Sequence, residues 1–233
     1  MKKSKAPGGL SLNNVSRRQL NIIFAVDCSG SMAGEKINSL NMAMRIAEKD
    51  LRKAAISNVS VDMVVRVLRF STGAEWHIKG PVPVAEFQWV DLVVDRGDTD
   101  MGRALEMVAE ILPTLSATAR QLPPLIVLIS DGYPSDDFEK GRKALMDTQA
   151  GKKSVREAIA IGSDVDRETL QQFIDDPRFQ PLQAHNAAQI VEHIRWVSSE
   201  LLSQHSKGTE AQARLQKSGN EPPAPPAESD LVW

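Results

Sequence analysis

Runs of apolar residues alternate along the chain with stretches of helical periodicity. The segment Ser60–Ser71 is rich in β-branched side chains, which predicts a strand. Glu75–Lys79 is the predicted hairpin partner of this strand. Three further segments are dominated by apolar residues, as is typical of parallel strands that are covered on both faces. These segments are Asn21–Val26, Leu125–Ser130 and Val155–Gly162.

Helical periodicity separates these strands. Between Glu35 and Ala55, apolar residues recur every three or four positions and charged residues take the opposite face. Asn186 can cap a final helix. Further helices are predicted at Met101–Leu112, with Pro113 in the turn that follows, at Phe138–Ala150 and at Asp166–Ile174.

Strands that alternate with helices predict the α/β class. Each strand–helix–strand unit makes its strands parallel, so we expect a doubly wound, mostly parallel sheet with helices on both faces. Phe179–Leu182 predicts a short last strand, and Gly80–Asp98 predicts an irregular segment. Composition divides the chain into a flexible arm over 1–18, one domain over 19–205 and a Pro/Ala-rich tail over 206–233.

Charge and composition exclude several classes of protein. The formal net charge is −2, from 28 basic and 30 acidic side chains, which gives no basic face for nucleic acid. No apolar run approaches the roughly 20 residues of a membrane span. Cys28 is the only cysteine, so an internal disulfide is impossible, and the sequence predicts a cytoplasmic protein in a reducing compartment.

Oxygen-bearing side chains cluster at three points where strands end or helices begin. Asp27, Ser29 and Ser31 follow the first strand, Thr99 precedes a helix, and Asp131 follows the strand Leu125–Ser130. The carboxyl ends of parallel strands share one edge of a sheet, where ligands bind. Carboxylates and hydroxyls without a His or Cys pattern favour a hard divalent cation: Mg²⁺ first, with Mn²⁺ or Ca²⁺ as alternatives.

The neighbouring polar residues have ordinary structural interpretations. Asp98 and Asp100 flank Thr99 and are interpreted as acids that face solvent or favour the start of the next helix. Asp136 and Asp137 are predicted to cap the helix after the third cluster. Cys28 is interpreted as a small buried side chain without a redox role.

Together these segments resemble the metal-ion-dependent adhesion site (MIDAS) of von Willebrand factor A (VWA) domains. The matching motifs are AVDCSGSM at Ala25–Met32, a Thr-x-x-Gly loop at Thr99–Gly102 and SDG at Ser130–Gly132. The likeness covers roughly Leu20 to His205, and three motifs in this order are far more specific than Asp-x-Ser-x-Ser alone.

The resemblance implies roles for five residues. The hydroxyls of Ser29, Ser31 and Thr99 would coordinate the ion, and Asp27 and Asp131 would hold it directly or through waters. The sixth position would remain for a carboxylate of a protein partner or for water. The chain would therefore be a binding module and not an enzyme.

A narrower likeness is to the bacterial tellurium-resistance VWA proteins of the TerY type. It rests on SDGYPSDD at Ser130–Asp137 and on RWVS at Arg195–Ser198. It implies a scaffold or regulator in stress-response or phage-defence signalling, with a protein kinase and a PP2C-type phosphatase as partners. The sequence departs from this pattern at Asp98 and in its Pro-rich tail.

Two other functions stay open. A phosphatase of the haloacid dehalogenase class also has an acid after its first strand, but it needs a second aspartate where this chain has Ser29. The other alternative is a VWA subunit that partners a MoxR-type or chelatase ATPase of the AAA+ class.

Overall fold

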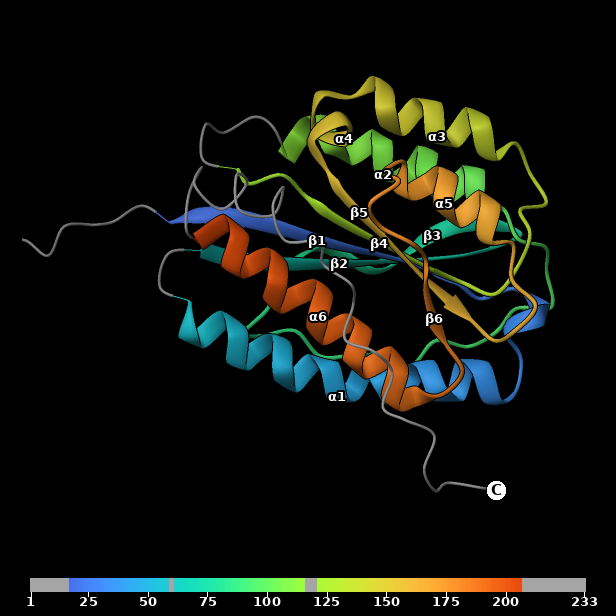
Figure 1. The fold of residues 1–233 in the computed structure, drawn as a ribbon, viewed down its shortest axis with the longest axis horizontal. Coiled ribbons are helices and arrows are strands. Elements are labelled where there is room, and N and C mark those ends of the chain that lie inside the picture. Colours follow the sequence, from blue (N-terminus) through green and yellow to red (C-terminus); the bar gives the residue numbers. More distant parts are fainter. Residues whose placement is uncertain (1–16, 59–60, 116–120, 207–233) are drawn as a thin grey trace, which may run out of the picture.

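A six-stranded sheet lies between two layers of helices in the computed structural model, which describes residues 17–58, 61–115 and 121–206 (Figure 1). The strand order is β3-β2-β1-β4-β5-β6, and only β3 runs antiparallel to its neighbour. The strands are β1 (Arg18–Asp27), β2 (Val61–Ser71), β3 (Gly73–Pro83), β4 (Leu125–Ser130), β5 (Val155–Ile161) and β6 (Leu182–Ala184).

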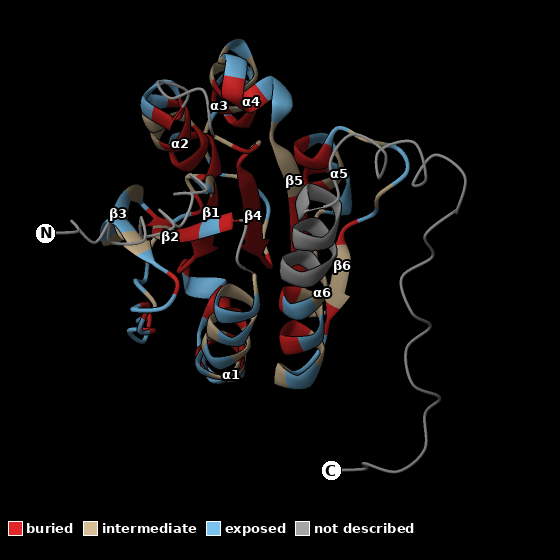
Figure 2. Ribbon diagram, turned by 90° about the vertical axis from the view of Figure 1, so that its left-hand side faces the viewer, coloured by how far each residue is buried: buried red, intermediate tan, exposed pale blue. Residues whose placement is uncertain are grey.

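Helices cover both faces of this sheet, as predicted. α1 (Glu35–Ser57) and α6 (Ala187–Ser206) lie on one face (Figures 1 and 2). The opposite face carries α2 (Met101–Leu115), α3 (Phe138–Asp147), α4 (Gln149–Lys153) and α5 (Arg167–Ile174). In the part of the chain that the structure describes, no helix is long and apolar enough to cross a bilayer. The predicted arm and tail lie largely outside the described ranges.

Alternate residues of the central strands enter two separate cores. Phe24 and Val26 of β1 pack in the core under α1 and α6, whereas Ile23 and Ala25 pack in the core under α2 to α5. Figure 2 shows the buried residues gathered on the strands and on the sheet-facing sides of the helices. Burial on both faces explains why β1 is continuously apolar from Ile22 to Val26.

The order of the strands creates a crevice at the ends of β1 and β4. From β1 the chain continues to β2 and β3 on one side, and it later returns to build β4, β5 and β6 on the other. The loops after β1 and β4 therefore diverge, which is the topological switch point where α/β sheets bind ligands. Asp27 is the last residue of β1, and Asp131 follows the last residue of β4.

Two predicted helices have different bounds. α2 continues through Pro113 to Leu115, so the prediction that Pro113 lies in a turn is wrong. Pro113 costs this helix one hydrogen bond, because it has no N–H to donate to the carbonyl of Ala109, and the burial of Leu115 in the core favours the continued helix. The segment Phe138–Ala150 is not one helix, because Thr148 has extended backbone angles and its side chain accepts a hydrogen bond from Gly151 N at the start of α4.

The outer strands also differ from the prediction. Phe179–Leu182 is not the last strand, because β6 begins only at Leu182. Pro181 precedes it and has no N–H to donate to a neighbouring strand. At the opposite edge β3 extends to Pro83, beyond the predicted Glu75–Lys79, and forms a long, half-exposed edge strand.

Helices α2 and α3 approach each other without intervening side chains at Gly102 and Gly141. A Cβ atom on Gly141 would lie 2.1 Å from the Gly102 carbonyl oxygen, and one on Gly102 would lie 2.3 Å from the Asp137 carbonyl oxygen. Real Cβ atoms do not come so close to backbone. The glycine of the Thr-x-x-Gly motif is therefore required for helix packing directly beside Thr99.

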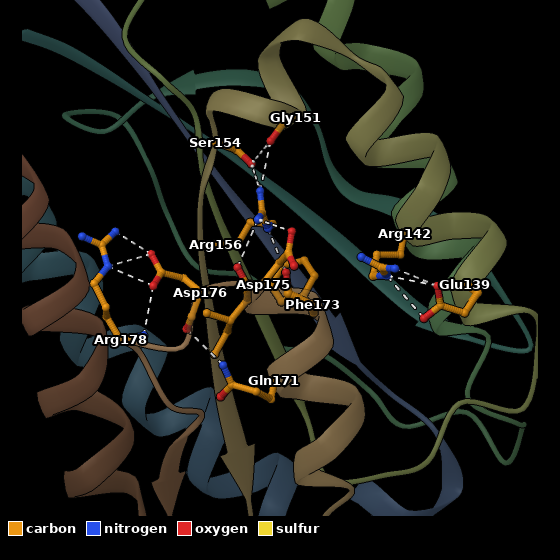
Figure 3. A network of polar contacts seen from close by, with 11 residues as sticks. Glu139, Arg142, Gly151, Ser154, Arg156, Gln171, Phe173, Asp175, Asp176 and Arg178 are labelled. Carbon is orange, nitrogen blue, oxygen red and sulfur yellow. Dashed lines mark hydrogen bonds and ion pairs between the residues drawn. The ribbon is translucent and has the colours of Figure 1, made fainter.

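A buried arginine ties α4 and α5 to the sheet (Figure 3). Arg156 of β5 donates to the carbonyl oxygens of Gly151, Phe173 and Ile174 at 3.1, 2.8 and 3.1 Å. These carbonyls lie near the carboxyl ends of the two helices, where a cation is favourable. The network fixes α4 and α5 against β5.

Candidate metal site

The five predicted ligand residues meet at the switch point. Asp27 closes β1, and both of its carboxylate oxygens accept hydrogen bonds: Oδ1 from Ser29 N at 2.8 Å and Oδ2 from Ser130 Oγ at 2.6 Å. The second bond joins the ends of β1 and β4. The carboxylate is thereby held in one orientation at the base of the crevice.

A chain of hydroxyls leads from Asp27's loop to Asp131. Ser29 Oγ and Ser31 Oγ are 2.9 Å apart, and Ser31 Oγ donates to Asp131 Oδ1 at 2.7 Å. Lys36 Nζ forms an ion pair with Asp131 Oδ2. Both oxygens of Asp131 thus have partners within the site.

Gly132 marks the point where the three loops converge. A Cβ atom built there would lie 3.5 Å from Thr99 Oγ1, 3.7 Å from Ser31 Oγ and 3.8 Å from Asp27 Oδ2. Side-chain oxygens from residues far apart in the sequence therefore surround one small region. The structure brings together all five residues singled out from the sequence.

Hydrogen bonds between the loops hold this arrangement. Gly30 N donates to Gly97 O at 3.2 Å, which joins the first loop to the second. Thr99 N donates to Ser135 Oγ at 2.7 Å, and Ser135 N donates to Thr99 O at 2.9 Å, which joins the second loop to the third. These bonds fix the backbone of Thr99 and thereby set the position of its hydroxyl.

Burial makes a bound cation favourable here. Asp27 is fully buried and Asp131 is 2 % exposed. Burial raises the pKa of Asp27, hydrogen bonds from Ser130 and Ser29 oppose that rise, and the charge of Asp131 adds to it. Two neighbouring buried carboxylates are unfavourable unless a positive charge compensates them.

The donor set fits a hard divalent cation. Three hydroxyls and two carboxylates supply only oxygen, the ligand type of Mg²⁺ and Ca²⁺. Among the described residues, no group of three or more His, Cys, Asp and Glu side chains could hold a metal. An ion in this crevice would therefore rely on Ser29, Ser31 and Thr99 as much as on the acids.

Sequence reasoning did not single out Lys36 or the role of Ser130. Lys36 lies in the first turn of α1, where a cation faces the positive end of the helix dipole. That unfavourable placement was the signal that could have indicated a carboxylate partner. Ser130 stands inside the SDG motif, but only the structure shows that its hydroxyl donates to Asp27.

The acidic neighbours mostly organise the loops. Asp100 accepts from Gly73 N at 2.6 Å and from Ser135 Oγ at 3.1 Å, and Asp98 is exposed. Asp137 caps α3, as predicted. Asp136 does not cap the same helix: it accepts from the first N–H groups of α2, at Gly102 and Arg103, because the two helix ends lie side by side.

Cys28 is expected to resist thiol reagents while the chain is folded. The side chain is fully buried, and burial, with the charge of Asp27 adding to it, raises the pKa of the thiol to about 12. Reaction with a disulfide reagent should be at least about a hundredfold slower in buffer than in denaturing urea. Fast labelling of the native chain would contradict the buried position of Cys28.

Comparison with known proteins identifies the family to which this fold belongs. The family model of the von Willebrand factor type A domain matches residues 21–193. The chain belongs to this family, whose members are usually binding modules without catalytic activity. Among curated proteins, none matches the sequence.

Solved structures share the fold at low sequence identity. A von Willebrand factor type A protein from Catenulispora acidiphila is 18 % identical, with a TM-score of 0.60 over 81 % of this chain and 42 % of that one. Proximal thread matrix protein 1 from the mussel byssus, solved with a zinc-occupied MIDAS motif, is 18 % identical, with a TM-score of 0.58 over 80 % and 48 %. The conserved hypothetical protein BatB from Bacteroides thetaiotaomicron is 12 % identical, with a TM-score of 0.58 over 79 % and 99 %. This chain spans less than half the length of the first two.

Proposed function

We propose that this VWA domain binds protein partners through a divalent cation held at the carboxyl edge of its sheet. The observation that carries the proposal is the convergence of Thr99, Ser31 and Asp27 oxygens on the space beside Gly132. Asp131 lies one hydrogen bond from Ser31 and completes the set. Mg²⁺ is the first candidate, with Mn²⁺ or Ca²⁺ as alternatives, because all five donors are oxygen.

The ligand types also indicate what a partner offers. Ser29, Ser31 and Thr99 are neutral donors, so a bound ion would keep part of its charge and supply an electrophilic position for an outside ligand. An Asp or Glu side chain of a partner protein suits that position. Ser31 is exposed at the rim, whereas Asp27 lies at the base, so the approach is from the Ser31 side.

The sequence also suggests which kinds of protein this domain binds. The resemblance at Ser130–Asp137 to TerY-type proteins supports a scaffold or regulator in bacterial stress-response or phage-defence signalling, with a protein kinase and a PP2C-type phosphatase as partners. Co-purification with an ATPase of the MoxR or chelatase type would favour the alternative assembly instead.

Calorimetric titration with Mg²⁺ tests the metal site. We expect one binding site per chain and at least tenfold weaker binding in Thr99→Ala and Asp27→Asn, because each loses an oxygen donor or its charge. Thr114→Ala is the matched control, since Thr114 is exposed on α2 and its hydroxyl donates to Ile111 O of the same helix. Equal affinity in all variants would show that the ion binds elsewhere.

Affinity capture from the native host tests the link between metal and partner. The wild-type chain and Thr114→Ala should retain a partner in Mg²⁺ and release it in EDTA. Thr99→Ala should fail to retain it in either buffer. A partner that stays bound in EDTA and to Thr99→Ala would place the interface on another face of the domain.

A further inference from the structure

A lysine reaches into the candidate metal site from the side of α1. Lys36 lies in the first turn of that helix, and its ammonium contacts Asp131 Oδ2. The Asp131 side chain is fully buried, while the Lys36 side chain is 35 % exposed. The ion pair therefore links a buried carboxylate to a lysine side chain that is partly exposed to solvent.

The side chain of Lys36 runs past Gly162, which has no side chain of its own to obstruct it. Gly162 follows β5 and has a φ of 93°, which favours glycine. A Cβ atom there would lie 3.1 Å from Lys36 Cε and 3.6 Å from Nζ. The end of the β5 strand and the first turn of α1 together guide the ammonium toward Asp131.

We propose that Lys36 is a built-in competitor of the metal ion for Asp131. One carboxylate oxygen of Asp131 accepts from Ser31, and the other faces the Lys36 ammonium. An ion that takes Asp131 as a ligand must share or replace this ammonium, since two cations at one carboxylate repel each other. The inference rests on the proposed metal site and adds a residue that regulates its occupancy.

Lys36 has different roles in the metal-free and the metal-bound domain. Without metal, Lys36 compensates one of two buried carboxylates and so stabilises the folded chain. With metal bound, its long side chain can turn into solvent while its stem stays against the protein. Lys36 should therefore lower metal affinity and keep the metal-free domain folded, so that occupancy follows the cation concentration.

Neutral replacement of Lys36 tests the competition. Lys36→Met removes the charge at nearly constant length, and Lys53→Met is the control, because Lys53 is on the same helix and its side chain is 80 % exposed. In calorimetry, Lys36→Met should bind Mg²⁺ roughly tenfold more tightly than wild type or more. In EDTA its thermal unfolding midpoint should be lower than that of Lys53→Met, and Mg²⁺ should raise it further than it raises wild type.

Equal or weaker Mg²⁺ affinity in Lys36→Met overturns the competition, while leaving the proposed metal site intact. If neither wild type nor the variant binds Mg²⁺, Mn²⁺ or Ca²⁺, both the metal site and the competition fail. Lys36→Gln is judged by the same criteria if Lys36→Met does not fold.

A labelling experiment needs no variant. Acetylation of wild-type Lys36, measured by mass spectrometry against Lys53, should increase when Mg²⁺ replaces EDTA, because the ammonium leaves Asp131. Unchanged labelling of Lys36 at saturating Mg²⁺ overturns the proposal.

Discussion

Replacing Gly141 by alanine is expected to lower the free energy of unfolding by about 3 kcal/mol or more. Alanine is usually the better residue inside a helix, by roughly 0.5–1 kcal/mol. Here the added methyl would lie 2.1 Å from the Gly102 carbonyl oxygen and 2.7 Å from Gly102 Cα. Relief requires α2 and α3 to move apart, which also disturbs the hydrogen bonds between Thr99 and Ser135.

Urea unfolding monitored by circular dichroism measures this effect. Asn38→Ala serves as the control, because Asn38 is exposed on α1 and the change follows ordinary helix propensity. Gly141→Ala should unfold at clearly lower urea, whereas Asn38→Ala should match or slightly exceed wild type. A neutral or stabilising Gly141→Ala would mean that the two helices are not in backbone contact.

Glu157 should make the domain less stable as pH rises toward neutrality. This carboxyl on β5 is buried, and burial, with a smaller contribution from Asp176, raises its pKa from 4.5 to about 7. The folded chain therefore holds this proton more tightly than the unfolded chain. The resulting stability is complete below pH 4.5 and is lost as pH passes 7. A shift of this size corresponds to roughly 3 kcal/mol.

The variant Glu157→Gln isolates that contribution. Glutamine resembles the protonated acid, so the two chains should have similar stability at about pH 5, and the variant should be more stable than wild type at about pH 8. Glu110→Gln is the control, because the Glu110 side chain is 61 % exposed, and it should follow wild type at both pH values. Parallel pH profiles for wild type and Glu157→Gln would contradict the raised pKa.

The central strands and the candidate ligands could be predicted because their signals are local. Strands buried on both faces have continuously apolar sequences, and β1 and β4 each end next to an acid. In a parallel sheet such ends share an edge, so Asp27 and Asp131 were expected on the same side of the domain, and the pairing of β1 with β4 brings them together. The loop at Thr99 followed from its motif.

Other features depend on contacts between distant segments. Asp136 stands one residue before the cap of α3, yet it binds the start of α2, because only the packed fold brings the two helix ends together. Lys36 contacts Asp131 across 95 residues of sequence. The start of β6 depended on where Pro181 interrupts pairing with β5. Periodicity contains no information on such contacts.

The outer strands restrict how this domain can associate. Along β3, Lys79 and Gly80 are exposed, and Pro81 and Pro83 cannot donate backbone hydrogen bonds to an added strand. At the other edge, β6 has only three residues. Both borders of the sheet therefore discourage strand addition by a second copy or by an extended peptide. Concentrated native protein should consequently form little aggregate by the addition of strands to its sheet.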